Sequence, residues 1–400
     1  MPIDGPRALR PGEMPALRAL EEAVFRPGMP DEYPQVFHEG NLDGLTVCFD
    51  GERCVSHAGM VNRGASILGC RVDLGMIGGV ATDPDYRGQG LAGACVDHAL
   101  AKARRDGLDF VLVSGDRSLY LRRGCATVGR DALFTLDPAA AGRLADAAPA
   151  LGLPRVRIEA LAEGDDAVAL LSDIYRREPV RFLRHREDYA DLMRCGVVLD
   201  RPSDFVAVRD AGAGTSLAYA IAPRERTDAP ADKPAPTPLL AEVSGDRRAI
   251  VAALPLLLRR YERASGLLLH VSRHDAPLRD LLTRAGVPSE PAAAEGTVRL
   301  VNFPQLMERL RPLWTEALGR TQAARLSFAE EGDDCVFLYE RDDARGAGAL
   351  RLGVGDAARL VFGTADRKDE SLLEGADPEL AEALRAVLPV PALWYGLSFV

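Results

Sequence analysis

The sequence predicts an α+β fold, in which a mixed sheet with flanking helices is followed by further domains. Short apolar runs alternate with segments of helical periodicity, and within 91–105 the residues Leu91, Cys95 and Ala99 fall on one helical face. Asp106-Gly107 ends that helix, and the apolar run 108–113 follows as a buried strand. The length of 400 residues exceeds what one domain usually holds.

The first domain is predicted to alternate strands and helices around one crossover. Because a helix between two strands joins parallel neighbours, 76–82 and 108–113 should lie side by side in the sheet. In chain order we expect a strand ending within 7–10, a helix at 11–24, strands at 45–49, 54–61 and 72–82, the helix 91–105, and strands at 108–113 and 126–136, the last closing the domain.

Two further domains are predicted, giving boundaries at roughly 1–140, 150–295 and 296–400. Strand, loop, helix and strand recur in the second domain, either as an internal duplication or as a chance α/β arrangement. Linkers or long loops are expected at 137–154, 223–238 and 286–296. The expected elements are strands at 205–208, 217–221, 239–244 and 267–271 with a helix at 248–263, then strands at 297–303, 324–330, 336–340 and 358–363 with helices at 305–311 and 378–387.

Composition excludes several classes of function. The formal net charge of −10 argues against a nucleic-acid partner, whose binding needs clustered Lys and Arg, and is compatible with a cationic small substrate. No apolar run reaches the roughly 18–20 residues that span a bilayer, and the N-terminus lacks an apolar signal core, so we expect a cytoplasmic protein without a membrane partner. The seven cysteines form no Cys-x-x-Cys pair and no His/Cys cluster, so no metal is expected.

The segment from Val80 to Ala92 is the most informative, because it lies between a predicted strand and a predicted helix. Gly88 and Gly90 lack a Cβ, so the backbone can approach a ligand, and N–H groups of the loop and first helical turn converge on one spot. The helix dipole and Arg87 add positive charge there, which predicts a diphosphate cradle. The P-loop spacing is absent, and no acidic ribose ligand follows as in a Rossmann fold.

Arg87-Gly88-Gln89-Gly90-Leu91-Ala92 resembles the signature of GNAT acetyltransferases, and 82–86 and 119–125 resemble the flanking elements of that superfamily. The resemblance implies a GNAT fold and an N-acetyltransferase that uses acetyl-CoA as co-substrate. The three-domain layout resembles the enhanced intracellular survival (Eis) type, which implies a degenerate second GNAT-like domain, a C-terminal sterol-carrier-like domain, and often a hexamer.

The same resemblance assigns site residues. Tyr120 matches the general acid, although a tyrosine packed on the core is the alternative, and the carboxylate of Val400 matches the general base, although a tail packed for stability alone is equally compatible. For Gly115 and Asp116, capping of the following helix is the alternative role. A backbone N–H of the strand before the loop would polarise the thioester carbonyl. The implied cofactor-binding residues are Val80, Ala81, Thr82, Arg87, Gly88, Gln89, Gly90, Leu91, Ala92, Gly93, Gly115 and Asp116.

Three functions follow as expectations. The first is transfer of acetyl to a primary amine of a small cationic molecule, aminoglycoside-like or a polyamine, by a homo-oligomer. The second is acetylation of a protein lysine or N-terminus. The third is a non-catalytic acetyl-CoA or lipid binder, against which the glycine loop and Tyr120 argue.

Overall fold

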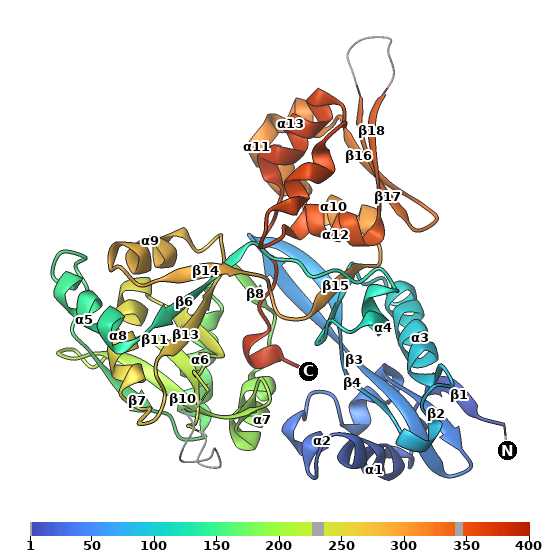
Figure 1. Ribbon diagram of the computed structural model, residues 1–400, viewed down its shortest axis with the longest axis horizontal. Helices are drawn as coiled ribbons and strands as arrows, with labels where there is room; N and C mark the ends of the chain where they lie inside the picture. Colours follow the sequence, from blue (N-terminus) through green and yellow to red (C-terminus); the bar gives the residue numbers. More distant parts are fainter. Residues whose placement is uncertain (1, 226–235, 341–346) are drawn as a thin grey trace. The chain divides into compact units, whose positions relative to one another are not determined.

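The computed structural model describes residues 2–225, 236–340 and 347–400, and Figure 1 shows its elements in sequence colours. The chain divides into two compact units. The first comprises the chain up to Gly129 together with Ala294–Leu393 and Val400, and the second comprises Arg130–Ala293 and Trp394–Phe399. The predicted α+β fold is confirmed. No helix in the described ranges is long and apolar enough to cross a membrane.

The first unit is built on a mixed sheet with the strand order β1-β2-β3-β4-β5-β15. Neighbours are antiparallel except β4 and β5, whose predicted parallel pairing is confirmed but ends at Ile77 opposite Val113. There the Ser114 N–H donates to the Ile77 carbonyl at 3.1 Å, and β4 continues to Thr82 with no described strand paired on that side. The strands are β1 (Asp4–Ala8), β2 (Leu45–Asp50), β3 (Arg53–Ile67), β4 (Cys70–Thr82), β5 (Phe110–Val113) and β15 (Thr297–Leu300).

Helix α3 (Leu91–Arg105) has the predicted bounds and packs its apolar face on this sheet. Cys95 and Ala99 are fully buried and Leu91 is partly buried in the same core, as the 3.6-residue spacing requires. The other helices of this part are α1 (Met14–Val24), α2 (Met29–Glu32) and α4 (Ser118–Leu121), with the 3-10 turns η1 (Glu39–Gly44) and η2 (Pro84–Tyr86).

Residues 294–393 continue the first unit. Strand β15 pairs with β5 and completes the first sheet, while β16, β17 and β18 form an antiparallel meander beside helices α10 to α13 (Figure 1). The strand expected at 358–363 is wrong: α12 covers it, because a short apolar run does not by itself distinguish a strand from a buried helix. The elements are β16 (Leu326–Glu331), β17 (Asp334–Glu340), β18 (Ala347–Gly353), α10 (Phe303–Arg309), α11 (Arg311–Ala323), α12 (Val354–Phe362), η3 (Lys368–Leu373) and α13 (Pro378–Val387).

The second unit contains two sheets, one with the order β12-β11-β10-β7 and one with the order β13-β6-β14. The predicted hairpin is confirmed as β10 and β11, and β13 has the predicted bounds. The elements are β6 (Asp131–Leu136), α5 (Pro138–Ala147), β7 (Val156–Ala160), α6 (Asp165–Tyr175), β8 (Val180–Phe182), α7 (Arg186–Cys195), β9 (Val197–Val198), β10 (Arg201–Asp210), β11 (Ser216–Pro223), β12 (Glu242–Gly245), α8 (Arg247–Leu258), β13 (Leu267–Val271), α9 (Ala276–Arg284), β14 (Ser289–Ala292) and η4 (Gly396–Ser398).

Several expected boundaries in this region are wrong. The strand expected at 126–136 is interrupted: Ala126 bridges to Val298 in the first unit, whereas β6 pairs with β13 and β14 in the second. The expected linker 137–154 holds helix α5, whose first turn is capped by the Asp137 carboxylate, and the loop expected at 286–296 holds β14. Residues 226–235 of the loop expected at 223–238 lie outside the described residues.

The division into three domains stays a prediction, because compactness separates the chain into two units only. The expected repeat of strand, loop, helix and strand is present as β12, α8 and β13, with a parallel bridge between Leu239 and Leu268.

Candidate active site

The loop after β4 presents an exposed turn at the start of α3. Gly88 and Gly90 both have φ near +79°, a left-handed conformation that side chains rarely adopt, and residues 87–90 are exposed. A Cβ on either glycine would meet nothing within 4 Å. The glycines are therefore required by backbone conformation, and the space in front of them is open to a ligand.

The N-terminus of α3 leaves its first N–H groups without a side-chain cap. Its N-cap is Gly90, and no acidic residue lies in the first turn. The corresponding helix of the second unit, α8, is capped by Asp246, whose carboxylate accepts from the Ala249 N–H at 2.8 Å. A carboxylate at that place would repel a phosphate, so of these two helix termini the α3 terminus has the electrostatics of an anion site.

The conformation of this loop is fixed by polar contacts on its protein side. The buried Asp83 carboxylate accepts from the Asp85 N–H at 3.0 Å and forms an ion pair with Arg53. The Tyr86 hydroxyl donates to Asp50 at 2.7 Å, and the Arg87 Nε donates to the backbone carbonyl before the turn at 3.3 Å. The turn is thus held in place before any ligand arrives, which lowers the entropy cost of binding.

The other predicted cofactor residues differ in how far they are exposed to solvent. Val80 and Thr82 are half-buried on β4, whereas Ala81 is buried. Gly93 is buried under the Arg123 guanidinium, which forms an ion pair with Asp97 at 2.6 Å, so Gly93 serves the packing of α3. Gln89 is exposed in the loop, and Leu91 and Ala92 are half-buried in the first turn of α3.

Tyr120 lies in α4, and its ring packs close to the end of β5. Its ring packs against Gly115, where a Cβ would come within 3.1 Å of it, and burial raises the pKa of its hydroxyl. The Gly115 carbonyl accepts from the Thr297 hydroxyl at 2.8 Å. The expected capping role of this loop is wrong: α4 begins after Arg117 with no side-chain cap, and Asp116 is exposed.

The last residue of the chain lies on β4. Val400 is buried, as the apolar tail predicts, and its carboxyl carbon occupies the place where a Cβ of Gly78 would be. Gly78 directly follows Ile77, the last β4 residue paired with β5. Tyr120 and Val400 therefore both lie where β4 and β5 part, and the structure brings the two predicted catalytic residues to one region.

Substituting Gly78 by alanine should lower turnover by displacing the terminal carboxylate. The added methyl group would overlap the Val400 carboxyl carbon and backbone oxygen, which must shift because a backbone atom cannot rotate away. We expect kcat to fall by about 10²-fold, since small misplacements of reacting groups have effects of this size. Gly75→Ala is the matched control, because its methyl group would meet the flexible Met60 side chain instead. Equal effects of the two substitutions would contradict the prediction.

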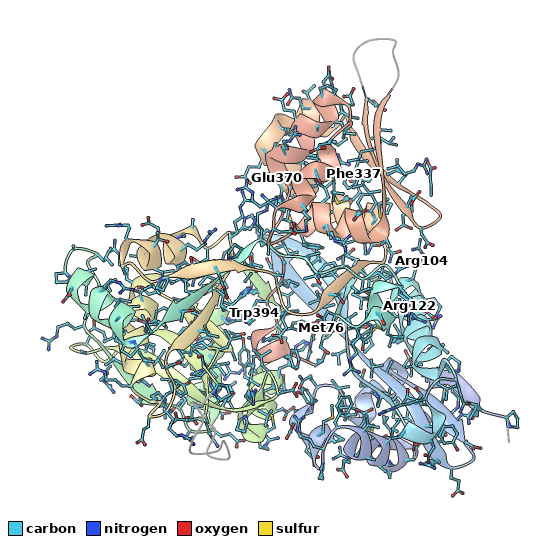
Figure 2. All side chains as sticks on the ribbon, viewed as in Figure 1. Met76, Arg104, Arg122, Phe337, Glu370 and Trp394 are labelled. Atoms are coloured by element: carbon cyan, nitrogen blue, oxygen red, sulfur yellow. The ribbon has the colours of Figure 1, made fainter. Side chains whose placement is uncertain are left out.

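Residues 394–399 are anchored in the second unit by a buried ion pair. Arg184 donates to both Glu242 carboxylate oxygens, at 2.8 and 2.6 Å, and its Nε donates to the Ser398 hydroxyl at 2.9 Å. Glu242 also accepts from the Leu397 N–H at 3.1 Å. Trp394, labelled in Figure 2, stacks on His270 with ring centroids 3.9 Å apart. These contacts hold the chain in place from Trp394 to Ser398.

Arg184→Met should lower the free energy of unfolding by about 3–5 kcal/mol, because it leaves the Glu242 carboxylate buried without its partner. Urea unfolding followed by circular dichroism measures the loss. Arg194→Met is the matched control: its ion pairs are exposed, so its removal should change stability by less than about 1 kcal/mol. A loss for Arg184→Met no larger than that of the control would refute the structural role of the pair.

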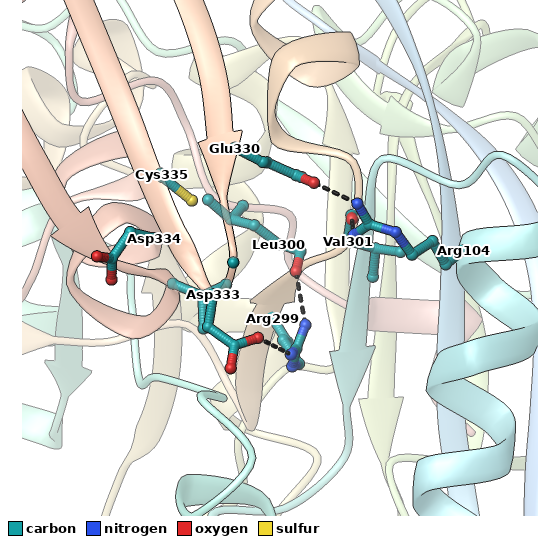
Figure 3. Close-up of a pocket in the computed structure, with 10 residues that line it drawn as sticks. Arg104, Arg299, Leu300, Val301, Glu330, Asp333, Asp334 and Cys335 are labelled. Carbon is teal, nitrogen blue, oxygen red and sulfur yellow. Dashed lines mark hydrogen bonds and ion pairs between the residues drawn. The ribbon is translucent and has the colours of Figure 1, made fainter.

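A surface pocket of the first unit is lined by none of the predicted site residues. Arg104, Arg299 and Glu330 line it, together with the turn between β16 and β17 (Figure 3). Its charged groups pair with one another: Arg104 binds Glu330 and the Val301 carbonyl, and Arg299 binds the Leu300 carbonyl at 3.0 Å. In the described part of the chain no group of three metal-ligating side chains occurs.

Sequence reasoning missed a buried acid–imidazole pair beside β4, formed by Glu21 of α1 and His57 of β3. The Glu21 and His57 side chains are fully buried, with Glu21 Oε1 2.8 Å from His57 Nδ1. One signal could have found it: Glu21 follows Leu17 by four residues, so a carboxylate falls on the apolar face of a helix.

Comparisons with known proteins agree with this geometry. Residues 6–128 match the family model described as an acetyltransferase (GNAT) domain. A search of curated proteins found no significant match. Among solved structures, Eis1 from Mycobacterium abscessus superimposes with a TM-score of 0.60 at 14% identity, covering 100% of both chains.

Two further structures are similar over nearly their whole length. One is a conserved protein of unknown function from Enterococcus faecalis V583, described as a probable N-acyltransferase, with a TM-score of 0.61 and 14% identity over 98% of this chain and 99% of that one. The other is a GCN5-related N-acetyltransferase from Anabaena variabilis, with a TM-score of 0.61 and 13% identity over 97% and 98%. At these identities the likeness concerns the fold.

Proposed function

We propose that the protein transfers the acetyl group of acetyl-CoA to a primary amine of a small cationic molecule, aminoglycoside-like or a polyamine, since residues 6–128 match the family model of a GNAT acetyltransferase domain. The single observation that carries the proposal is that the Val400 carboxyl group lies against Gly78 and the Tyr120 ring lies against Gly115, two glycines that closely follow the last paired residues of β4 and β5. An acid and a carboxylate at the free edge of a strand are what acetyl transfer to an ammonium substrate needs.

Acetyl-CoA is proposed to bind with its diphosphate at the exposed turn Arg87–Gly90 and its pantetheine arm along β4. The uncapped α3 terminus and Arg87 supply the positive charge. The residues 80–82, beyond the part of β4 that pairs with β5, offer backbone groups to the arm on that side of the strand. The rest of the cradle is formed by Gly88, Gln89, Leu91 and Ala92. Three further residues are proposed to lie beside the bound cofactor: Gly93, Gly115 and Asp116.

The acetyl-transfer step is assigned to two groups. The Val400 carboxylate accepts the proton of the ammonium substrate, and the amine nitrogen then attacks the thioester carbon. The C–S bond breaks as the amide forms, the Tyr120 hydroxyl donates its proton to the leaving thiolate, and the second proton lost by the attacking nitrogen returns to Tyr120, while the proton held by Val400 passes to water. Burial raises the Tyr120 pKa, so the hydroxyl keeps its proton until the thiolate develops. A carboxylate in the site also favours a cationic acceptor over a neutral one.

Release of free thiol from acetyl-CoA tests the proposal. A panel of polyamines, aminoglycosides and lysine peptides separates the acceptor classes, and we expect release with the small cationic amines. Release with peptides alone would replace the proposal by protein acetylation, and no release with any amine would favour a binding protein. The proposed homo-oligomer and the sterol-carrier-like nature of the last domain are tested separately, by sedimentation and by lipid titration.

Arg87→Gln should weaken acetyl-CoA binding by roughly tenfold or more, because a charged hydrogen bond to phosphate contributes about 1.5–3 kcal/mol. Isothermal calorimetry measures the affinity. Arg105→Gln is the matched control, since it removes the same charge from the opposite end of α3. The cradle would be misplaced if both variants bound acetyl-CoA with the same affinity.

A further inference from the structure

The buried pair of Glu21 and His57 contacts the backbone of β4 at one point. His57 Nδ1 lies 2.8 Å from Glu21 Oε1 and 2.8 Å from the Gly79 carbonyl oxygen. A carbonyl oxygen only accepts, so Nδ1 must carry the hydrogen that is shared between these two oxygens. The Phe37 ring packs against the imidazole, with ring centroids 5.8 Å apart. Glu21 therefore fixes the tautomer and direction of His57, and His57 binds the Gly79 carbonyl.

The Gly79 carbonyl belongs to an irregularity in β4. His57 pairs with Ala81 and Gly59 pairs with Gly78, so two β4 residues, Gly79 and Val80, stand opposite one residue of β3. Gly79 has φ +59°, which only glycine adopts readily. A peptide next to glycine in a bulge has few intrinsic constraints on its orientation, so contacts from outside the strand decide where its carbonyl and N–H point.

The peptide between Gly79 and Val80 is trans, and in a trans peptide the carbonyl and the N–H point in opposite directions. Since the carbonyl points at His57, the Val80 N–H points away from it. His57 belongs to β3 on one side of β4, and the other side of β4 has no described strand paired beyond Ile77. The Val80 N–H is thereby directed away from the His57 ring, and acetyl-CoA is proposed to bind on the side of β4 that has no described strand beyond Ile77.

The geometry points to Glu21 and His57 as positioning residues that hold the Gly79–Val80 peptide so that the Val80 N–H donates to the thioester carbonyl oxygen of acetyl-CoA. This inference rests on the proposed function. Without the bond from Nδ1, the Gly79 carbonyl loses its buried donor and the peptide can rotate. The carbonyl would then face the thioester oxygen and repel it, instead of the N–H stabilising it.

Two amide substitutions of His57 separate positioning from general packing. In His57→Asn the side-chain NH₂ takes the place of Nδ1, whereas in His57→Gln it takes the place of Nε2, so only asparagine can still donate to the Gly79 carbonyl. We expect His57→Asn to keep kcat within about fivefold of the wild type and His57→Gln to lose about 10²-fold, the usual effect of one missing oxyanion donor. Glu21→Gln keeps an acceptor for Nδ1, so its kcat should also stay within about fivefold of the wild type.

The decisive readout is the infrared band of the thioester carbonyl in bound acetyl-CoA labelled with ¹³C at that carbon. Its shift to lower frequency on binding should persist in His57→Asn and disappear in His57→Gln, while the Kd for acetyl-CoA, from calorimetry, stays within about threefold. An unchanged shift in His57→Gln would overturn the inference, as would equal losses in both variants. Should His57→Gln fail to fold, Glu21→Leu, which removes the acceptor that orients Nδ1, takes its place: a lost shift supports positioning, and a retained shift with lost kcat overturns the inference. Failure of the wild type to bind acetyl-CoA would instead refute the proposed function.

Discussion

Replacing Tyr120 by phenylalanine should lower kcat by about 10²–10⁴-fold, the range expected when a positioned general acid is removed. The ring is buried against Gly115 and the hydroxyl has a raised pKa, so the substitution removes one oxygen and keeps the packing. Because the ring contacts the end of β5 and not the loop at Arg87–Gly90, the Kd for acetyl-CoA should stay unchanged. Steady-state thiol release and calorimetry measure the two quantities.

Tyr339→Phe is the matched control for this substitution. Tyr339 is also a buried tyrosine of the first unit, but it lies in β17, outside the proposed site. Its replacement should leave kcat unchanged. Unaltered turnover in Tyr120→Phe would remove Tyr120 from the mechanism, and a parallel loss of acetyl-CoA affinity would reassign it to binding.

Deleting Phe399 and Val400 should abolish acetyl transfer, because it removes the carboxylate that lies on Gly78. The new terminal carboxylate, on Ser398, would lie two residues before the present one. Two residues of extended chain span about 7 Å, which is more than the roughly 3 Å needed for proton transfer. The anchor formed by Arg184 and Glu242 binds residues up to Ser398 and would remain. Loss of activity with an intact fold is therefore expected, measured by thiol release and circular dichroism.

Two further variants isolate the carboxylate from the side chains. Val400→Leu keeps the carboxylate in place and should retain most of the activity. One glycine added after Val400 keeps every native side chain but moves the carboxylate by about one residue length, and should inactivate the enzyme. Full activity in the extended chain would show that the tail serves packing alone.

The local parts of the site could be predicted from the sequence. The start of α3, the glycine loop before it and the strand β4 depend on residues adjacent in the chain, so spacing was sufficient to predict them. The crossover rule then gave the parallel pairing of β4 with β5. Likewise, the apolar character of the last segment was sufficient to predict a buried terminus, because a frayed end is usually polar.

Other features depended on contacts between distant segments. The apolar run at 126–136 carries no mark of the point where it passes from the first unit into the second, and the apolar pattern of α12 fits a strand over six residues. Glu21 and His57 are 36 residues apart, and a lone carboxylate on one helix does not reveal the imidazole that faces it.

By itself, then, the sequence predicted the glycine turn before α3 and a buried end of the chain, because these follow from short-range conformation and from the apolar character of the last residues. Only the tertiary structure decided that the terminal carboxyl group lies on Gly78 and that His57 directs the Gly79 carbonyl. The physical reason is that such placements result from the packing of the whole chain, where burial selects one arrangement among many that the local sequence permits.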